Sequence, residues 1–151
     1  MKDPFGRGIF AGSIGVIVIN LVEYLLAYLQ ISETPLWVAG GLVFLSEKAL
    51  ATPLEIFIGV LSNVFVAIVV GIAISYYIFF SGTDFAVLKG VGISLIVLFL
   101  AQGVIFPMRE LAPEIKDSPS DVLAAFIDHT VFGALSGYVI KCTHEKKFST
   151  E

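Results

Sequence analysis

Hydrophobic residues gather in four long runs along this chain, and only a few polar side chains interrupt each run. The runs cover residues 8–31, 54–80, 88–106 and 122–142. About 20 helical residues cross a hydrocarbon layer about 30 Å thick, so each run is long enough to form a transmembrane helix. The pattern predicts an all-α membrane protein whose four transmembrane helices form an antiparallel bundle.

A fifth apolar stretch, residues 36–46, lies between the first two runs and is too short to cross a membrane. Gly40 and Gly41 lie in its middle, and Trp37 follows Pro35 at its start. Tryptophan is enriched where membrane and water meet, and short helices are tolerated at the interface or inside the protein. This stretch is predicted to form a short interfacial or re-entrant helix.

The composition agrees with a membrane location, because 57% of the 151 residues are hydrophobic and only 15% are charged. Four spans with short loops use nearly the whole chain, which predicts a single integral membrane domain over residues 1–151. The net charge of −4 includes no long run of one sign, so nucleic acid is not an expected partner and membrane lipids are. Cys142 is the only cysteine, which excludes an intrachain disulfide.

The basic residues are distributed unequally between the two sides of the predicted membrane. Six fall on the side of the chain ends, namely Lys2, Arg7, Lys89, Lys141, Lys146 and Lys147. Three fall on the other side, namely Lys48, Arg109 and Lys116. Cytoplasmic loops carry the excess of Lys and Arg, so both termini are predicted to be cytoplasmic. The acidic loop between the third and fourth runs would then be external; its acids are Glu110, Glu114, Asp117 and Asp121.

Small residues recur at helical spacing and predict which faces of the helices pack together. The second run carries a ridge with one member every four residues, formed by Glu55, Gly59, Asn63, Ala67, Gly71 and Ser75. The fourth run has a similar ridge of Ala125, His129, Gly133 and Gly137. The first run begins with a GxxxG pair, Gly8 and Gly12. Small residues let helices approach closely where lipid supplies no hydrophobic drive for association. The third run has only a rough line of Gly92, Ile96, Phe99 and Gly103, which predicts a helix that faces lipid or a second copy of the chain.

Every run also contains polar side chains that hydrocarbon disfavours, namely Asn20, Glu23, Asn63, Gln102, Asp128 and His129. With 1.5 Å of rise per residue, at least one from each run falls within roughly 10 Å of the bilayer centre, on its outer side. Ionisable residues inside a membrane are expensive and mark functional sites by default. The sequence therefore predicts one polar layer, in which Glu23 pairs with Asp128 or His129 to handle protons or cations and the amides orient them.

A structural interpretation of the same layer stays open. Polar side chains also hydrogen-bond across membrane helices and set their register, each contact contributing roughly 0.6 kcal/mol on average. The chain has no nucleotide-binding loop, metal signature or nucleophile motif, so neither enzymatic activity nor a cofactor or metal is expected. An intramembrane enzyme is the third and weakest hypothesis.

The stretch 82–90, GTDFAVLKG, is followed by an apolar run, an acidic loop and FIDHTVFG over residues 126–133. This order resembles small bacterial membrane proteins, mostly from Firmicutes and akin to the YqhR and YagU types. The resemblance covers roughly the last two thirds of the chain. It implies a four-helix integral membrane protein of the bacterial cytoplasmic membrane, with Asp128 and His129 as its most distinctive residues, and it implies no substrate.

Two functions are therefore weighed. One is a transporter or channel-like protein for protons, cations or a small solute, which works as an oligomer because four short helices enclose little volume. The other is a non-transporting accessory, scaffold or lipid-binding subunit of a membrane complex, in which the polar layer only holds the bundle together.

Overall fold

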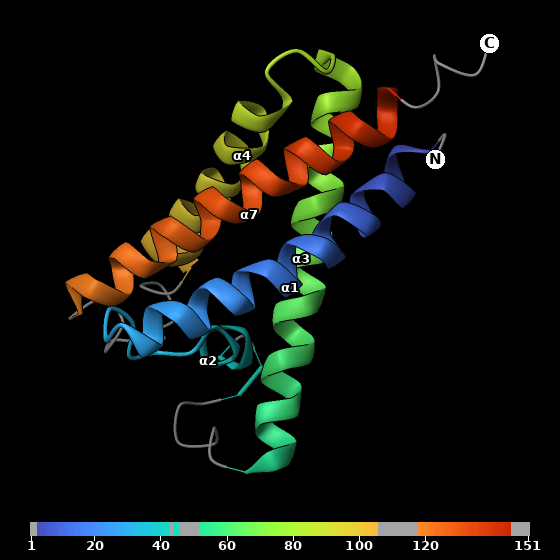
Figure 1. Cartoon of the computed structure of the whole chain (residues 1–151). Helices are drawn as coiled ribbons and strands as arrows, with labels where there is room; N and C mark the ends of the chain where they lie inside the picture. Colours follow the sequence, from blue (N-terminus) through green and yellow to red (C-terminus); the bar gives the residue numbers. More distant parts are fainter. Residues whose placement is uncertain (1–2, 43, 46–51, 106–117, 146–151) are drawn as a thin grey trace.

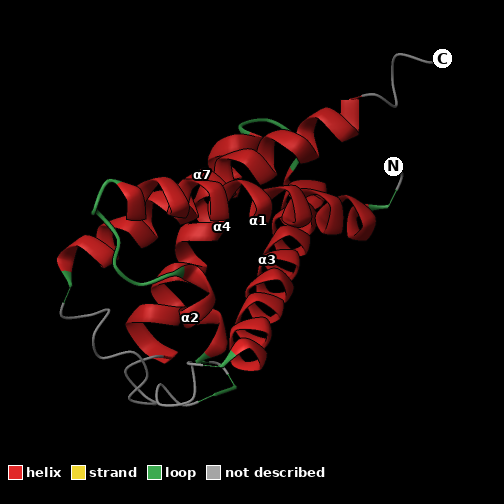
Figure 2. Ribbon diagram, turned by 60° about the horizontal axis from the view of Figure 1, so that its bottom comes forward, coloured by secondary structure: helices red, strands yellow, loops and turns green. Residues whose placement is uncertain are grey.

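The computed structural model describes residues 3–42, 44–45, 52–105 and 118–145 (Figure 1). All regular elements in these ranges are helical (Figure 2): α1 (Pro4–Tyr28), α2 (Leu36–Gly41), α3 (Pro53–Ser81), α4 (Ala86–Leu100), the π-helical turn η2 (Ala101–Ile105) and α7 (Pro119–Glu145). Position 106 of the third predicted run, positions 43 and 46 of the predicted short helix and most of the acidic loop lie outside the described residues.

Three of the long helices begin at the same kind of dipeptide, a capping residue followed by proline. Asp3 accepts a hydrogen bond from Gly6 N at 2.8 Å, and Thr52 forms a reciprocal capping box with Glu55. The Ser118 hydroxyl accepts from Asp121 N at 3.2 Å. These side chains satisfy N–H groups that a helix start leaves free, and proline suits the first helical position. The helices therefore begin one to four residues before the apolar runs that predicted them.

Four of the described segments are long and apolar enough to cross a membrane, which confirms the predicted fold class. Large apolar side chains on their outer surfaces are exposed, among them Ile17, Leu21, Phe65, Phe80 and Leu88. In water such a surface would drive aggregation, whereas in a bilayer these apolar side chains contact the hydrocarbon chains of the lipid. The short helix predicted between the first two spans is α2.

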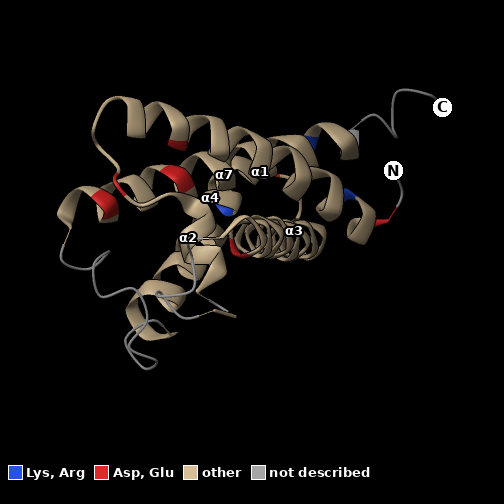
Figure 3. Cartoon of the chain, turned by 90° about the horizontal axis from the view of Figure 1, so that it is seen from below, with Lys and Arg blue, Asp and Glu red and all other residues tan. Residues whose placement is uncertain are grey.

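α1 and α7 lie side by side and run in opposite directions, with α4 packed along α7 (Figure 1). α3 crosses them steeply and is seen end-on from below (Figure 3). α1 and α3 touch near the start of α1 and then diverge, and α2 packs against α3 in the angle between them (Figure 1). The start of α1, the turn between α3 and α4 and the end of α7 all lie at the same end of the molecule (Figure 1).

The predicted small-residue faces meet where helices cross. A Cβ added at Gly71 would lie 2.6 Å from Gly8 O, and one added at Gly12 would lie 2.6 Å from Ala67 O. Gly59 faces the backbone of Trp37 in α2. In turn, a Cβ added at Gly40 of α2 would lie 2.7 Å from Gly59 O. The ridge on α3 therefore contacts α1 over one half of its length and α2 over the other.

The line of residues noted in the third span is not the face of α4 that packs inside the bundle, and the sequence pattern had not identified the packing face. A Cβ at Gly92 or Gly103 would meet nothing within 4 Å, whereas the buried residues of α4 are Ala86, Gly90, Ser94 and Leu98. These lie every four residues and pack against Gly133 and Gly137 of α7; a Cβ at Gly133 would lie 2.5 Å from Gly90 O. α4 nevertheless has the smallest share of buried residues among the four spans, as a lipid-facing helix should.

Candidate functional site

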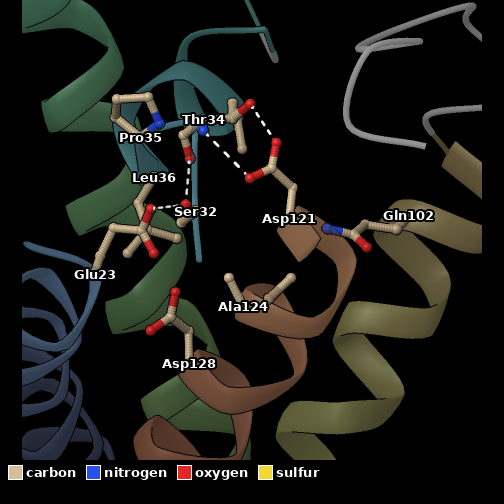
Figure 4. Close-up of a pocket in the computed structure, with 11 residues that line it drawn as sticks. Glu23, Ser32, Thr34, Pro35, Leu36, Gln102, Asp121, Ala124 and Asp128 are labelled. Carbon is tan, nitrogen blue, oxygen red and sulfur yellow. Dashed lines mark hydrogen bonds between the residues drawn. The ribbon is translucent and has the colours of Figure 1, made fainter. Parts of the chain in front are cut away.

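Two carboxyl groups face each other inside the bundle, at the contact between α1 and α7 (Figure 4). They belong to Glu23, which is 7% exposed, and Asp128, which is 1% exposed. Both lie among small and apolar residues on the inner faces of two antiparallel helices, where the tight packing of the bundle brings them together. Of the two partners that the sequence left open for Glu23, Asp128 is the one that the fold places opposite it.

The two carboxyl groups have different neighbours. The buried hydroxyl of Ser32 donates a hydrogen bond to Glu23 Oε1. No N–H or O–H group of the described residues donates a hydrogen bond to either oxygen of Asp128, whose polar neighbour is the carboxyl group of Glu23. An unpaired carboxylate costs about 2.5–3.5 kcal/mol at the centre of a membrane helix by insertion scales, and a second like charge adds to that cost. A proton shared by the pair, or a cation between them, removes this penalty.

A third acidic residue, Asp121, ties the α1–α2 linker to the start of α7. Its Oδ1 accepts a hydrogen bond from Glu33 N at 2.8 Å. Figure 4 shows the two bonds from Thr34, in which N donates to Oδ1 at 3.4 Å and Oγ1 donates to Oδ2 at 2.8 Å. The linker so held carries Ser32 to Glu23. In the sequence, Asp121 stood out only as a loop charge, and Ser32 and Thr34 did not stand out at all. The Ser118–Pro119 helix start, which puts Asp121 in the first turn of α7, was the available signal.

A cavity of about 40 Å³ lies between the linker, α1, α7 and η2. Its polar lining comes from Glu23, Ser32, Thr34, Gln102, Asp121 and Asp128 (Figure 4). A cavity needs about 10–15 Å³ to hold one water molecule, so this space has room for two or three. Gln102 reaches it from η2, and π-helical turns of this kind recur at functional sites. We call this space the linker cavity.

A second cavity, of about 60 Å³, lies where all four long helices meet. Asp128 forms part of its wall too, together with Asn63, Ser94, His129 and Phe132. The Nδ1 atom of His129 lies 3.0 Å from Ala125 O of its own helix, so the imidazole belongs to this space and not to the carboxyl pair. We call it the central cavity.

The structure places the six predicted polar residues in two groups and leaves one apart. Glu23, Asp128 and Gln102 meet at the linker cavity, and Asp128, His129 and Asn63 meet at the central cavity. Asn20 is exposed and its Nδ2 donates to Val16 O of its own helix at 2.7 Å. It lines an outer groove of about 240 Å³ between α1 and α2, which it shares with Glu23.

Asn20 therefore does not orient the carboxyl pair, contrary to its assigned role in the polar layer. Within residues 3–42, 44–45, 52–105 and 118–145, no three His, Cys, Asp or Glu side chains converge closely enough to hold a metal ion.

The four spans and their buried carboxyl pair define a multi-pass helical membrane protein. Comparisons with protein-family models, curated proteins and solved structures gave no match to this chain. The resemblance to the YqhR and YagU types therefore stays a prediction.

Proposed function

We propose that this protein is a small transporter or channel-like protein that moves protons or a monovalent cation across the bacterial cytoplasmic membrane, as an oligomer. Glu23 and Asp128 would bind the ion. The observation that carries the proposal is the buried carboxyl pair, whose Asp128 member has no hydrogen-bond partner among the described residues.

Physical cost favours an ion at this pair over a purely structural role. Two amides, or an amide and a hydroxyl, would join α1 to α7 without any charge to neutralise, whereas two carboxyl groups hold together only with a proton or a cation between them. Membrane proteins retain such groups where an ion must enter and leave. The small volume of the linker cavity, about 40 Å³, suits a single dehydrated ion or a few waters better than a larger solute.

The proposed orientation has both termini in the cytoplasm. The linker cavity then lies towards the external side, since α2 and the α1–α2 linker are at the opposite end of the molecule from the chain ends (Figure 1). An external ion would reach Asp128 through the space between Ser32 and Asp121.

The test is ion flux into proteoliposomes, read by a pH-sensitive dye for protons and by isotope uptake for Na⁺ and K⁺. We expect the natural protein to conduct one of these ions, and Glu23→Gln and Asp128→Asn each to reduce the flux at least tenfold. Asp84→Asn, an exposed carboxylate in the α3–α4 turn, is the control and should leave the flux unchanged. Background flux of the natural protein for all three ions, or full flux in both carboxyl variants, contradicts the proposal.

One set of contacts favours the accessory or scaffold function instead. The three hydrogen bonds that Asp121 accepts, and the bond from Ser32 to Glu23, hold the linker in place as structural bonds would. If the polar residues only lock the bundle, Gly133→Leu should lower stability in detergent far more than His129→Ala, and no ion flux should be found.

A further inference from the structure

The central cavity is lined by all four long helices and by Leu36 of α2, and buried polar atoms without protein partners border it. Both carboxyl oxygens of Asp128 and the hydroxyl of Ser94 are buried and unpartnered, and Ser94 is 0% exposed. Asn63 and His129 also line this space, and among the described residues neither the Asn63 side-chain amide nor His129 Nε2 forms a hydrogen bond.

Polar atoms without partners predict what fills this cavity. A buried donor or acceptor without a hydrogen bond costs about 1–3 kcal/mol, and apolar cavities stay dry whereas polar ones hold ordered water. At about 10–15 Å³ for each water molecule, the volume of about 60 Å³ accommodates roughly four. Asp128, Ser94, Asn63 and His129 together offer enough partners for such a cluster.

The position of Asp128 connects this cluster to the ion pair. Its carboxyl faces Glu23 across the α1–α7 contact and also borders the central cavity, so it is the shared wall between the two cavities. His129 follows it on α7. With Nδ1–H donating to Ala125 O, the neutral imidazole keeps a lone pair on Nε2, which can accept a proton through water.

Tight packing closes the central cavity towards the end of the molecule that carries the termini. Phe132 is 4% exposed, and a Cβ added at Gly15 would lie 2.5 Å from its Cε2 atom. Ser136 lies directly beyond, one helical turn further along α7, and is completely buried. The aromatic ring therefore fills the α1–α7 contact between the cavity and the chain ends.

We propose that the central cavity is a second binding site, which holds a cluster of water molecules and passes a proton between Asp128 and His129, with Phe132 closing it on the side of the termini. The step rests on the proposed function. The proton leaves the Asp128 carboxyl through a water molecule and arrives at His129 Nε2, which leaves a carboxylate and an imidazolium; the reverse step restores both. Ser94 and Asn63 position the water.

The water cluster is tested on the full chain in lipid bilayers with uniform ¹⁵N labelling. The chain has two histidines, so His144→Gln assigns the His129 signals. In a solid-state experiment that transfers polarisation from water, we expect the His129 Nε2 signal to grow at least three times faster than the amide signal of Ile140, a buried core residue. An Nε2 signal that grows no faster than this amide signal shows a dry cavity and overturns the proposal.

A matched pair of variants tests the role of the hydroxyl. Ser94→Thr keeps the hydroxyl and adds a methyl group, whereas Ser94→Val has the same shape as threonine with a methyl group in place of the hydroxyl. We expect the transfer rate to His129 Nε2 to persist in Ser94→Thr and to fall at least twofold in Ser94→Val. Asn63→Leu provides the same test if the Ser94 variants do not fold, and an unchanged rate in a folded Ser94→Val or Asn63→Leu protein contradicts a water cluster held by these side chains.

Flux measurements separate this inference from the proposed function. We expect His129→Gln and Ser94→Val to reduce proton flux at least fivefold, and Ser94→Thr to retain it. If Asp128→Asn stops the flux while His129→Gln and Ser94→Val conduct fully, the carboxyl pair carries the function and the proton step to His129 is wrong. If the natural protein does not conduct, the proposed function and the proton step both fail, and polarisation transfer alone decides whether the site holds water.

Discussion

At the scale of single residues, Asp121 shows how one carboxylate can organise a segment distant in the sequence. It accepts three hydrogen bonds from Glu33 and Thr34, which lie 88 and 87 positions earlier in the chain. The N–H groups of Gln30, Ile31 and Ser32 bond back to the last turns of α1, whereas those of Glu33 and Thr34 need partners from elsewhere. Asp121 supplies them, and the linker in turn places Ser32 beside Glu23.

Thr34→Val removes the hydroxyl that donates to Asp121 Oδ2 and keeps the shape of the side chain. Hydrogen bonds to charged groups contribute about 1.5–3 kcal/mol, and we expect the free energy of unfolding to fall by that amount. The measurement is reversible unfolding in mixed detergent micelles. Thr130→Val, on the exposed face of α7, is the matched control and should change stability by less than about 0.5 kcal/mol. Equal effects of the two substitutions would show that the Thr34–Asp121 bond contributes nothing specific.

At the scale of elements, α4 and α7 associate through backbone contact and not through large side chains. Gly90 and Gly133 approach so closely that a Cβ on either would clash with the carbonyl of the other, while Gly92, on the same helix, faces open space. Dispersion between closely packed backbones is the main attraction available to helices in lipid, so the missing Cβ atoms create the interface.

Gly90→Ala and Gly92→Ala form a second matched pair, two positions apart on one helix. The added methyl group at position 90 must push α4 away from α7, and we expect a loss of about 1–3 kcal/mol in the free energy of unfolding. At position 92 it meets nothing, and the higher helix propensity of alanine should raise stability by up to about 1 kcal/mol. Thermal unfolding in detergent measures both, and a Gly90→Ala protein as stable as Gly92→Ala would show that the two helices do not pack as described.

At the scale of the whole molecule, the four spans bring the start of α1, the α3–α4 turn and the end of α7 to one end, and the α1–α2 linker to the other (Figure 1). In the α3–α4 turn, Lys89 Nζ donates to Ser81 O at 2.9 Å and Gly82 O at 2.8 Å, so its charge lies at the carboxyl end of α3, where a helix favours cations. The excess of basic residues at this end predicts that it faces the cytoplasm.

Cysteine labelling in cells tests this orientation. In a Cys142→Ser background, Glu33→Cys should react with a membrane-impermeant maleimide added to intact cells, and Asp84→Cys should react only after the membrane is opened, since both native side chains are exposed. The opposite pattern would reverse the proposed orientation. Labelling of both positions from outside would contradict four membrane crossings.

The sequence predicted the spans well because their signal is local. The length of an apolar run and the cost of an unpaired peptide group in lipid require helices there, whatever surrounds them. The ridge through Gly59 and Gly71 and the GxxxG pairs of the first and fourth spans were also correct, since small residues at a spacing of four define one face of any helix. The face of α4 was missed because Ala86 and Ser94 are less conspicuous than the glycines at 92 and 103.

The site was predicted less completely, because it depends on how helices rotate about their axes and cross. Depth along the helices predicted one level for Glu23, Gln102 and Asp128, and these three residues line the linker cavity together. Depth could not tell whether Asp128 or His129 faces Glu23, since neighbours on a helix differ by about 100° in direction. Nor could it show that Asn20 points outward or that Asp121 reaches the linker.

The sequence by itself determined that this chain is a four-span helical membrane protein with costly carboxyl groups on its packing faces, because apolar length and small-residue spacing act within a single helix. Only the tertiary structure decided that Glu23 meets Asp128, that the polar residues divide between two cavities and that α3 crosses α1 and makes room for α2. Those outcomes depend on crossing angles, which backbone contacts at Gly8, Gly12 and Gly71 set between segments about 60 residues apart.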